Sequence, residues 1–111
     1  MIYTSAQSFF EYAENVKRLS REEELAYAIK MKAGDEEAKQ AIVNGYLPIL
    51  AAYLKRYTRE ASLEYIYRGI ETLNEAVEKF DFQIENPTFT RFLQNEIRRM
   101  ATRYIADSSA K

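Results

Sequence analysis

The chain has 111 residues, of which 47% are hydrophobic and 30% are charged, and its formal net charge is −1. This length accommodates one domain with a modest hydrophobic core. Cysteine and histidine are both absent, which excludes disulfide bonds and thiolate metal sites and removes the commonest general base and metal ligand. We therefore expect a single domain over residues 1–111 that is not an enzyme and binds no cofactor or metal.

No apolar run approaches the roughly 20 residues that a membrane span requires, and the N-terminus lacks the basic start of a signal peptide. We expect a cytoplasmic protein without a membrane partner.

Helical patterns occupy nearly the whole chain. Thr4 or Ser5 is predicted to cap a first helix that extends through Arg18. Its buried stripe is formed by Phe9, Phe10, Ala13 and Val16.

A second helix is predicted to begin at Ser20, because Ser20 and Glu23 have the spacing of a capping box. It runs to Ala33 and stops at Gly34, and Asp35 caps a third helix. The residues predicted to be buried in the second helix are Leu25, Ala28, Ile29 and Met31.

The third helix carries the broadest apolar band and is interrupted by Gly45 and Pro48. A proline in a helix interior removes a backbone hydrogen bond, so a kink or a split is expected near residues 44–48. Ser62 is predicted to cap a fourth helix over Leu63 to Phe80.

A fifth helix is predicted from the Asn86–Pro87 break to about Ala106, with residues 107–111 frayed. The expected fold is therefore an all-α, compact bundle of about five helices.

Charge is distributed unevenly along the chain. From Pro87 onward five basic residues stand against two acidic ones, whereas residues 60–85 contain seven acidic residues and two basic ones. This asymmetry suggests two partners on two faces, although solvated helix faces give the same pattern.

The last predicted helix places phenylalanines beside arginines, a pattern that suits unstacked bases and phosphates. Phe89 and Phe92 are spaced i, i+3 and are equally suited to a base pocket or to the core. Arg98 and Arg99 are adjacent and point in different directions, so at most one shares the aromatic face.

Five segments, in order, carry a resemblance to a known family. They are LSREEE at 19–24, AGDEEAK at 33–39, KRY at 55–57, AVEKFD at 76–81, and FT, IR and TR at 89–90, 97–98 and 102–103. In this order and spacing the chain resembles bacterial RNA polymerase sigma factors of the sigma-70 type, across the end of conserved region 1 and all of region 2.

The resemblance implies a transcription initiation protein with two partners. The fourth helix would dock on the clamp helices of the polymerase largest subunit, through Glu64, Tyr67, Arg68, Glu71 and Asn74. The fifth would capture the melted non-template strand of the minus-ten promoter element, through Phe89, Arg91, Phe92, Arg98, Arg99 and Arg103. No segment resembles region 4, so we expect that a partner protein supplies it, that the chain is a domain of a split or mobile-element-type sigma-like regulator, or that the sequence is truncated.

The chain departs from the family pattern at several of these positions. Asn95 and Glu96 stand where the family carries a Trp pair, Arg99 replaces a Gln, and Tyr67–Arg68 replaces a Gln–Glu pair. These departures support an alternative, in which a degenerate sigma fold acts as a protein-interaction module or regulator that does not melt promoter DNA.

Overall fold

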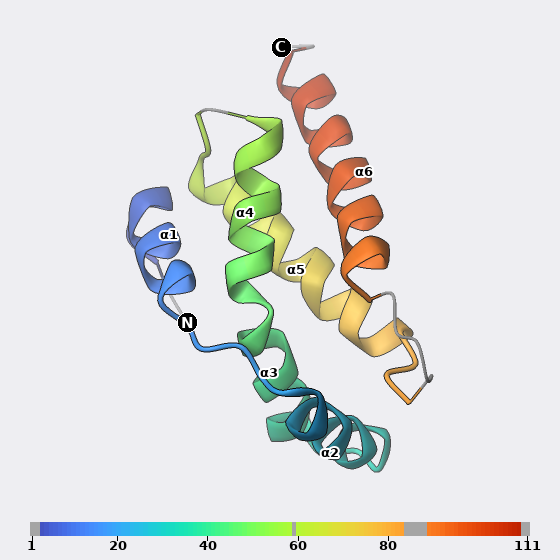
Figure 1. Ribbon diagram of the computed structural model, residues 1–111. Coiled ribbons are helices and arrows are strands. Elements are labelled where there is room, and N and C mark those ends of the chain that lie inside the picture. The colour runs from blue at the N-terminus through green and yellow to red at the C-terminus, as the bar shows by residue number, and fades with distance from the viewer. Residues whose placement is uncertain (1–2, 59, 84–88, 110–111) are drawn as a thin grey trace.

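The structure is a computed structural model that describes residues 3–58, 60–83 and 89–109. These residues form six α-helices and no strand, which confirms the all-α prediction (Figure 1). In chain order the helices are α1 (Ala6–Glu14), α2 (Arg21–Lys32), α3 (Glu36–Gly45), α4 (Leu47–Tyr57), α5 (Leu63–Lys79) and α6 (Phe89–Ser109).

Helix α1 begins at the predicted cap but is shorter than predicted. The Ser5 side chain accepts a hydrogen bond from the Ser8 backbone N–H at 3.0 Å. The helix ends at Glu14, and Asn15 closes it, so the prediction of helix through Arg18 was wrong. The connection that follows allows Val16 and Leu19 to turn toward the core.

Helices α2 and α3 form a hairpin at one end of the molecule (Figure 1). The predicted capping box at Ser20 is present, and Gly34 adopts a φ of 98° between the two helices, a conformation that favours glycine. Ile29 was predicted to be buried but is 60% exposed. Among the described helices α2 packs against α3 alone, so only a narrow stripe of its surface is covered.

The predicted interruption of the third helix is a complete split at Tyr46, which separates α3 from α4. Pro48 lies in the first turn of α4, where its missing N–H is not required by the helix. The split raises the number of helices in the described chain to six, where about five were predicted.

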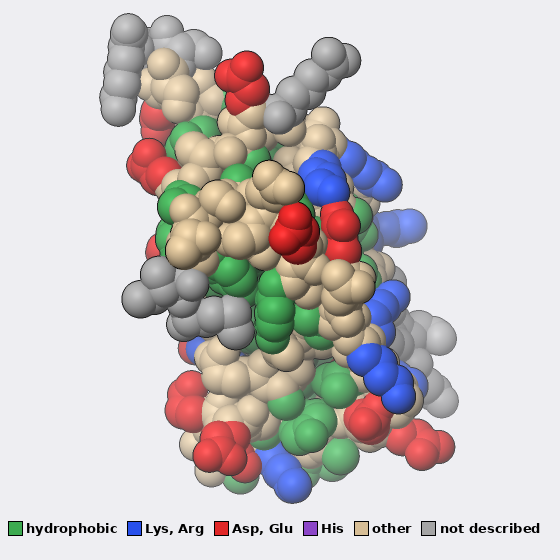
Figure 2. Space-filling model, turned by 90° about the vertical axis from the view of Figure 1, so that its left-hand side faces the viewer, with side chains coloured by type: hydrophobic (Ala, Val, Ile, Leu, Met, Phe, Trp, Pro, Cys, Tyr) green, Lys and Arg blue, Asp and Glu red, His purple; other side chains and the backbone are tan. Residues whose placement is uncertain are grey.

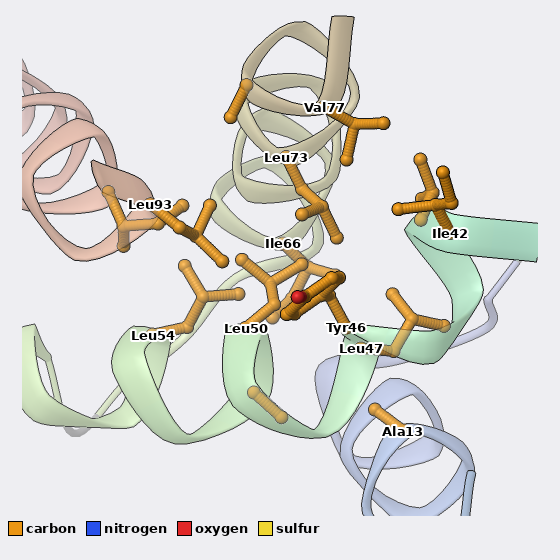
Figure 3. Close-up of a cluster of buried hydrophobic side chains, with 14 of the residues drawn as sticks. Ala13, Ile42, Tyr46, Leu47, Leu50, Leu54, Ile66, Leu73, Val77 and Leu93 are labelled. Carbon is orange, nitrogen blue, oxygen red and sulfur yellow. The ribbon is translucent and has the colours of Figure 1, made fainter. Parts of the chain in front are cut away.

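The core lies where α1, α3, α4, α5 and α6 meet. Figure 3 shows Leu50 and Leu54 of α4 directed toward Ile66 and Leu73 of α5, with Leu93 approaching from α6. Each of these five side chains is fully buried. The crossing of α4 and α5 is close, because a Cβ atom at Gly69 would lie 2.8 Å from Leu54 Cδ2.

Helices α5 and α6 run side by side and in opposite directions (Figure 1). Ser62 caps α5 as predicted, by accepting a hydrogen bond from the Tyr65 N–H at 3.1 Å. Helix α6 continues beyond the predicted end at Ala106, since no glycine or proline interrupts it before Ser109. The predicted cap at Asn86–Pro87 lies outside the described residues. Within the described chain, no helix has the length and apolarity needed to cross a bilayer.

Candidate nucleic-acid interface

The first turn of α6 is enclosed in an aromatic cluster. The ring centroid of Phe89 lies 4.6 Å from that of Tyr46, 4.9 Å from that of Phe82 and 5.2 Å from that of Phe80. Phe89 is only 2% exposed. The structure therefore places this predicted DNA-binding residue in the core, which is the alternative that its spacing left open.

Phe92 lies at the rim of the same cluster. Its ring is 5.8 Å from Phe80 and 6.4 Å from Phe89, and the residue is half-buried. Of the two predicted base-pocket rings, Phe92 is thus the one that retains contact with solvent.

The four predicted DNA-binding arginines are exposed and divide between two flanks of α6. Arg99 follows Phe92 by seven residues, close to two helical turns, and Arg103 follows Arg99 by one further turn. These three residues therefore share a flank. Arg91 and Arg98 are also seven residues apart and occupy a different flank, in keeping with the expectation that Arg98 and Arg99 diverge.

A groove between α5 and α6 brings the two predicted sets of partner-binding residues together. It has a volume of about 580 Å³ and is called the α5–α6 groove below. Its lining consists of Arg68, Glu71, Thr72, Glu75, Glu96, Arg99, Met100 and Arg103. Three arginines and three glutamates thus line one groove, so the predicted polymerase-binding and DNA-binding faces adjoin.

The positive charge of this groove extends toward the end of α6. A second hollow, of about 410 Å³, is lined by Arg98, Arg99, Thr102, Arg103 and Ala106. It contains three arginines and no acidic residue. Arg99 is 73% exposed at its side chain and only 3.8 Å from Glu96, which is a loose surface ion pair.

The predicted polymerase-binding residues on α5 have different surroundings. Glu64 and Glu71 are exposed, whereas Asn74 is half-buried and accepts a hydrogen bond from the Gln40 side chain at 3.4 Å. Tyr67 is 37% exposed, and its hydroxyl accepts a hydrogen bond from the Tyr3 N–H at 2.8 Å. The N-terminal segment therefore contacts one edge of this face.

Arg68 points toward α6. Its guanidinium pairs with Glu64 at 3.0 Å, and its Cζ lies 5.4 Å from the ring centroid of Tyr104. The hydroxyl groups of Tyr104 and Ser62 are 2.7 Å apart and share a hydrogen bond. Sequence patterns did not indicate this contact, because Arg68 and Tyr104 are far apart in the chain.

A polar cluster adjoins Phe89 through Tyr46. The Tyr46 hydroxyl donates a hydrogen bond to Glu24 Oε1, and Arg21 Nη1 is 3.1 Å from Glu24 Oε2. Burial raises the pKa of the Tyr46 hydroxyl well above its usual value, and the neighbouring Glu24 carboxylate adds to this effect. No sequence pattern indicated this cluster, because Tyr46 and Glu24 are far apart in the chain.

Figure 2 shows the side of the molecule that carries α1. Lysine and arginine side chains gather along its right-hand edge, whereas acidic side chains are scattered over its upper left, centre, lower left and lower right. The described residues contain no group of three or more acidic side chains arranged to hold a metal ion. Charged surfaces and the α5–α6 groove are therefore the features of the described chain that best suit a macromolecular partner.

Comparison with known proteins identifies sigma factors among the relatives of this chain. The chain is 36% identical over 96 residues to RNA polymerase sigma factor SigA of Listeria monocytogenes, and equally to SigA of Listeria innocua. The match covers 85% of this chain and 25% of each relative. This similarity supports a relationship to the sigma-70 family.

The chain thus spans about a quarter of the length of the curated sigma factors that it matches. No protein-family model matches the sequence.

Proposed function

We propose that this protein is a sigma-factor-like transcription initiation protein that acts in the cytoplasm and binds core RNA polymerase and minus-ten promoter DNA. The similarity to SigA over most of the chain is the observation that carries this proposal. We also propose that this chain acts together with a region-4 module, supplied by a partner protein or by another part of a longer chain.

The proposed DNA-binding surface is the exposed part of α6. Arg98, Arg99 and Arg103 line a hollow without acidic side chains, and guanidinium groups pair well with phosphate oxygens. Phe92 lies on the flank of Arg99 and Arg103 and offers a partly open ring for stacking. In this proposal, phosphate contacts provide most of the binding energy, and Phe92 contacts a base of the single strand.

The proposed polymerase-binding surface is the outer face of α5. Glu64, Glu71, Glu75 and Glu78 are all exposed and recur along this face, which therefore suits a basic surface on the clamp helices of the polymerase. Tyr67 and Asn74 lie on the same side of the helix. Arg68 is assigned a different role below, since its guanidinium is directed toward α6.

Two observations favour a second candidate, a sigma-fold interaction module that does not melt DNA. Phe89 is buried and presents no stacking face, and Glu96 lies in the α5–α6 groove next to Arg99. A carboxylate in this position opposes a phosphate. This candidate predicts polymerase binding without binding of single-stranded promoter DNA.

One experiment distinguishes the two candidates. Core polymerase is incubated with the tagged protein, and the captured complex is then offered a fluorescent single-stranded minus-ten oligonucleotide. We expect capture of polymerase by the wild type and loss of capture by Glu64→Lys/Glu71→Lys. The matched control, Glu36→Lys/Glu37→Lys, reverses two exposed acidic residues in the first turn of α3 and should retain capture.

Binding of the oligonucleotide supports the first candidate. Capture of polymerase without oligonucleotide binding supports the interaction module. Failure of the wild type to capture polymerase contradicts both candidates.

A further inference from the structure

Tyr104, in the second half of α6, contacts the start of α5. Its hydroxyl shares a hydrogen bond with Ser62 at 2.7 Å, and its ring centroid lies 5.3 Å from that of Tyr65. Because Ser62 is the N-cap of α5, this contact joins α6 to the rigid first turn of a neighbouring helix.

Arg68 covers the same tyrosine ring. Its guanidinium carbon is 5.4 Å from the ring centroid of Tyr104, within the range of a cation–π contact. Glu64 holds the other side of the guanidinium through an ion pair of 3.0 Å. Ser62, Glu64, Arg68 and Tyr104 therefore form one connected cluster, called the Tyr104 latch below.

The latch lies at the end of the packed part of α6. Ala101 is the last fully buried residue of the helix, and the residues from Ile105 to Ser108 are exposed. Helix ends that lack packing contacts fray. Tyr104 thus provides the final anchor of α6, and it directly follows Arg103, an arginine of the proposed DNA-binding surface.

We propose that Arg68 is a positioning residue for nucleic-acid binding, which holds the arginine-bearing half of α6 in place through Tyr104. The proposal rests on the function proposed above. The proposal also explains why a basic residue lies on an otherwise acidic face of α5. The Arg68 guanidinium forms an ion pair with Glu64 and packs on the ring of Tyr104, and in this proposal it contacts neither the polymerase nor DNA.

The test compares Arg68→Ala with Arg68→Lys, which retains a cation beside Glu64 and Tyr104. Amide hydrogen exchange across residues 98–108 is measured first. We expect exchange to become about three- to tenfold faster in Arg68→Ala, the range that corresponds to loss of a partly exposed cation–π contact. Arg68→Lys should recover most of this protection. If Arg68→Ala is poorly folded, Tyr104→Phe replaces it, since this variant removes only the hydroxyl bond to Ser62.

A matched control comes from α4. Arg56 also lies 5.4 Å from a tyrosine ring centroid, that of Tyr53, but it makes no contact with Tyr104. Arg56→Ala should leave the exchange of residues 98–108 at the wild-type rate. Equal acceleration in both variants would show a general loss of stability and would overturn the positioning role.

Binding of the single-stranded oligonucleotide is measured next, as a function of salt. If Arg68 is a positioning residue, Arg68→Ala should bind the oligonucleotide several-fold more weakly than the wild type. The salt dependence of binding should stay unchanged, because the substitution removes no phosphate contact. A shallower salt dependence would identify Arg68 as a phosphate contact and overturn the inference, as would unchanged exchange. If the wild type binds no oligonucleotide, the proposed DNA-binding function fails, and the exchange result still reports whether the latch holds α6.

Discussion

The two halves of α6 differ in how much of their surface is packed against the rest of the protein. The first half, from Phe89 to Ile97, contributes three fully buried side chains to the core, and its phenylalanines pack on aromatic rings from other elements. The second half carries Arg98, Arg99 and Arg103 into solvent and has Tyr104 as its last anchor. The fold thus places both phenylalanines of α6 in a half that packs on the core, called the stabilising half below, and three of its arginines in an exposed half that we propose to bind DNA, called the binding half.

The strongest test of the stabilising half is Phe89→Ala. We expect it to lower the free energy of unfolding by about 3–5 kcal/mol, since a buried ring is replaced by a cavity. Urea denaturation followed by circular dichroism measures this loss. Phe92→Ala is the matched control, and its loss should be smaller because Phe92 is half-buried. Equal losses would remove the distinction between the two rings.

The next largest effect on stability is expected at Tyr46, which packs against Phe89 and donates a hydrogen bond to Glu24. Tyr46→Phe keeps the ring and removes the hydroxyl, so the buried carboxylate of Glu24 loses a donor. We expect a loss of about 1.5–3 kcal/mol in the free energy of unfolding, the range for hydrogen bonds to charged groups. Tyr53→Phe, whose hydroxyl makes a long 3.4 Å contact with the Thr90 carbonyl, should cost much less.

Tyr65 links α5 to the second half of α6 through its contact with Tyr104, and its contribution to the free energy of unfolding depends on pH. Its hydroxyl donates to the Leu54 carbonyl at 2.8 Å, and burial, together with Tyr57 and Tyr104, raises its pKa to about 12. In the unfolded chain a tyrosine ionises near pH 10, so the unfolded state loses a proton first, and stability falls as pH rises from about 10 toward 12.

Tyr65→Phe should lower the free energy of unfolding by about 1 kcal/mol at neutral pH and make this alkaline decline shallower. Thermal denaturation at a series of pH values measures both effects. An equally steep decline in the variant would contradict the assignment of this proton to Tyr65.

The smallest effect on stability is expected in the binding half. Arg103→Ala removes an exposed side chain at the α5–α6 groove and should change the free energy of unfolding by no more than about 0.5 kcal/mol. Urea denaturation measures this change beside that of Phe89→Ala. If Arg103→Ala lowered the free energy of unfolding as much as Phe89→Ala, both halves of α6 would be structural. This result would contradict the difference between the two halves.

Much of the fold could be predicted from the sequence because its signals are local. The capping residues Ser5, Ser20, Asp35 and Ser62 act within one helical turn and were identified correctly. The end of α1 and the exposure of Ile29 were not predicted. Both depend on which neighbouring helix covers a given stripe, which helical spacing alone does not specify.

The candidate site was predicted less completely for the same reason. The i, i+3 spacing of Phe89 and Phe92 gives both rings a similar face, yet the cluster of Tyr46, Phe80 and Phe82 encloses only Phe89 fully. The spacing predicts that Arg98 and Arg99 lie on different flanks of α6, yet both line the hollow near the end of the helix. It carried no information on the latch between Tyr104 and Arg68, whose members are distant in the chain and meet only when α5 and α6 pack together.

Above all, we propose that Arg99 and Arg103 bind the phosphates of single-stranded promoter DNA. The most direct test measures the affinity for a fluorescent minus-ten oligonucleotide at several salt concentrations, for the wild type and for Arg99→Ala/Arg103→Ala. We expect weaker binding by the variant and a slope of log affinity against log salt that is shallower by about 1.4, which corresponds to two lost contacts to a single strand. Identical slopes, or a wild type that does not bind, would contradict the claim.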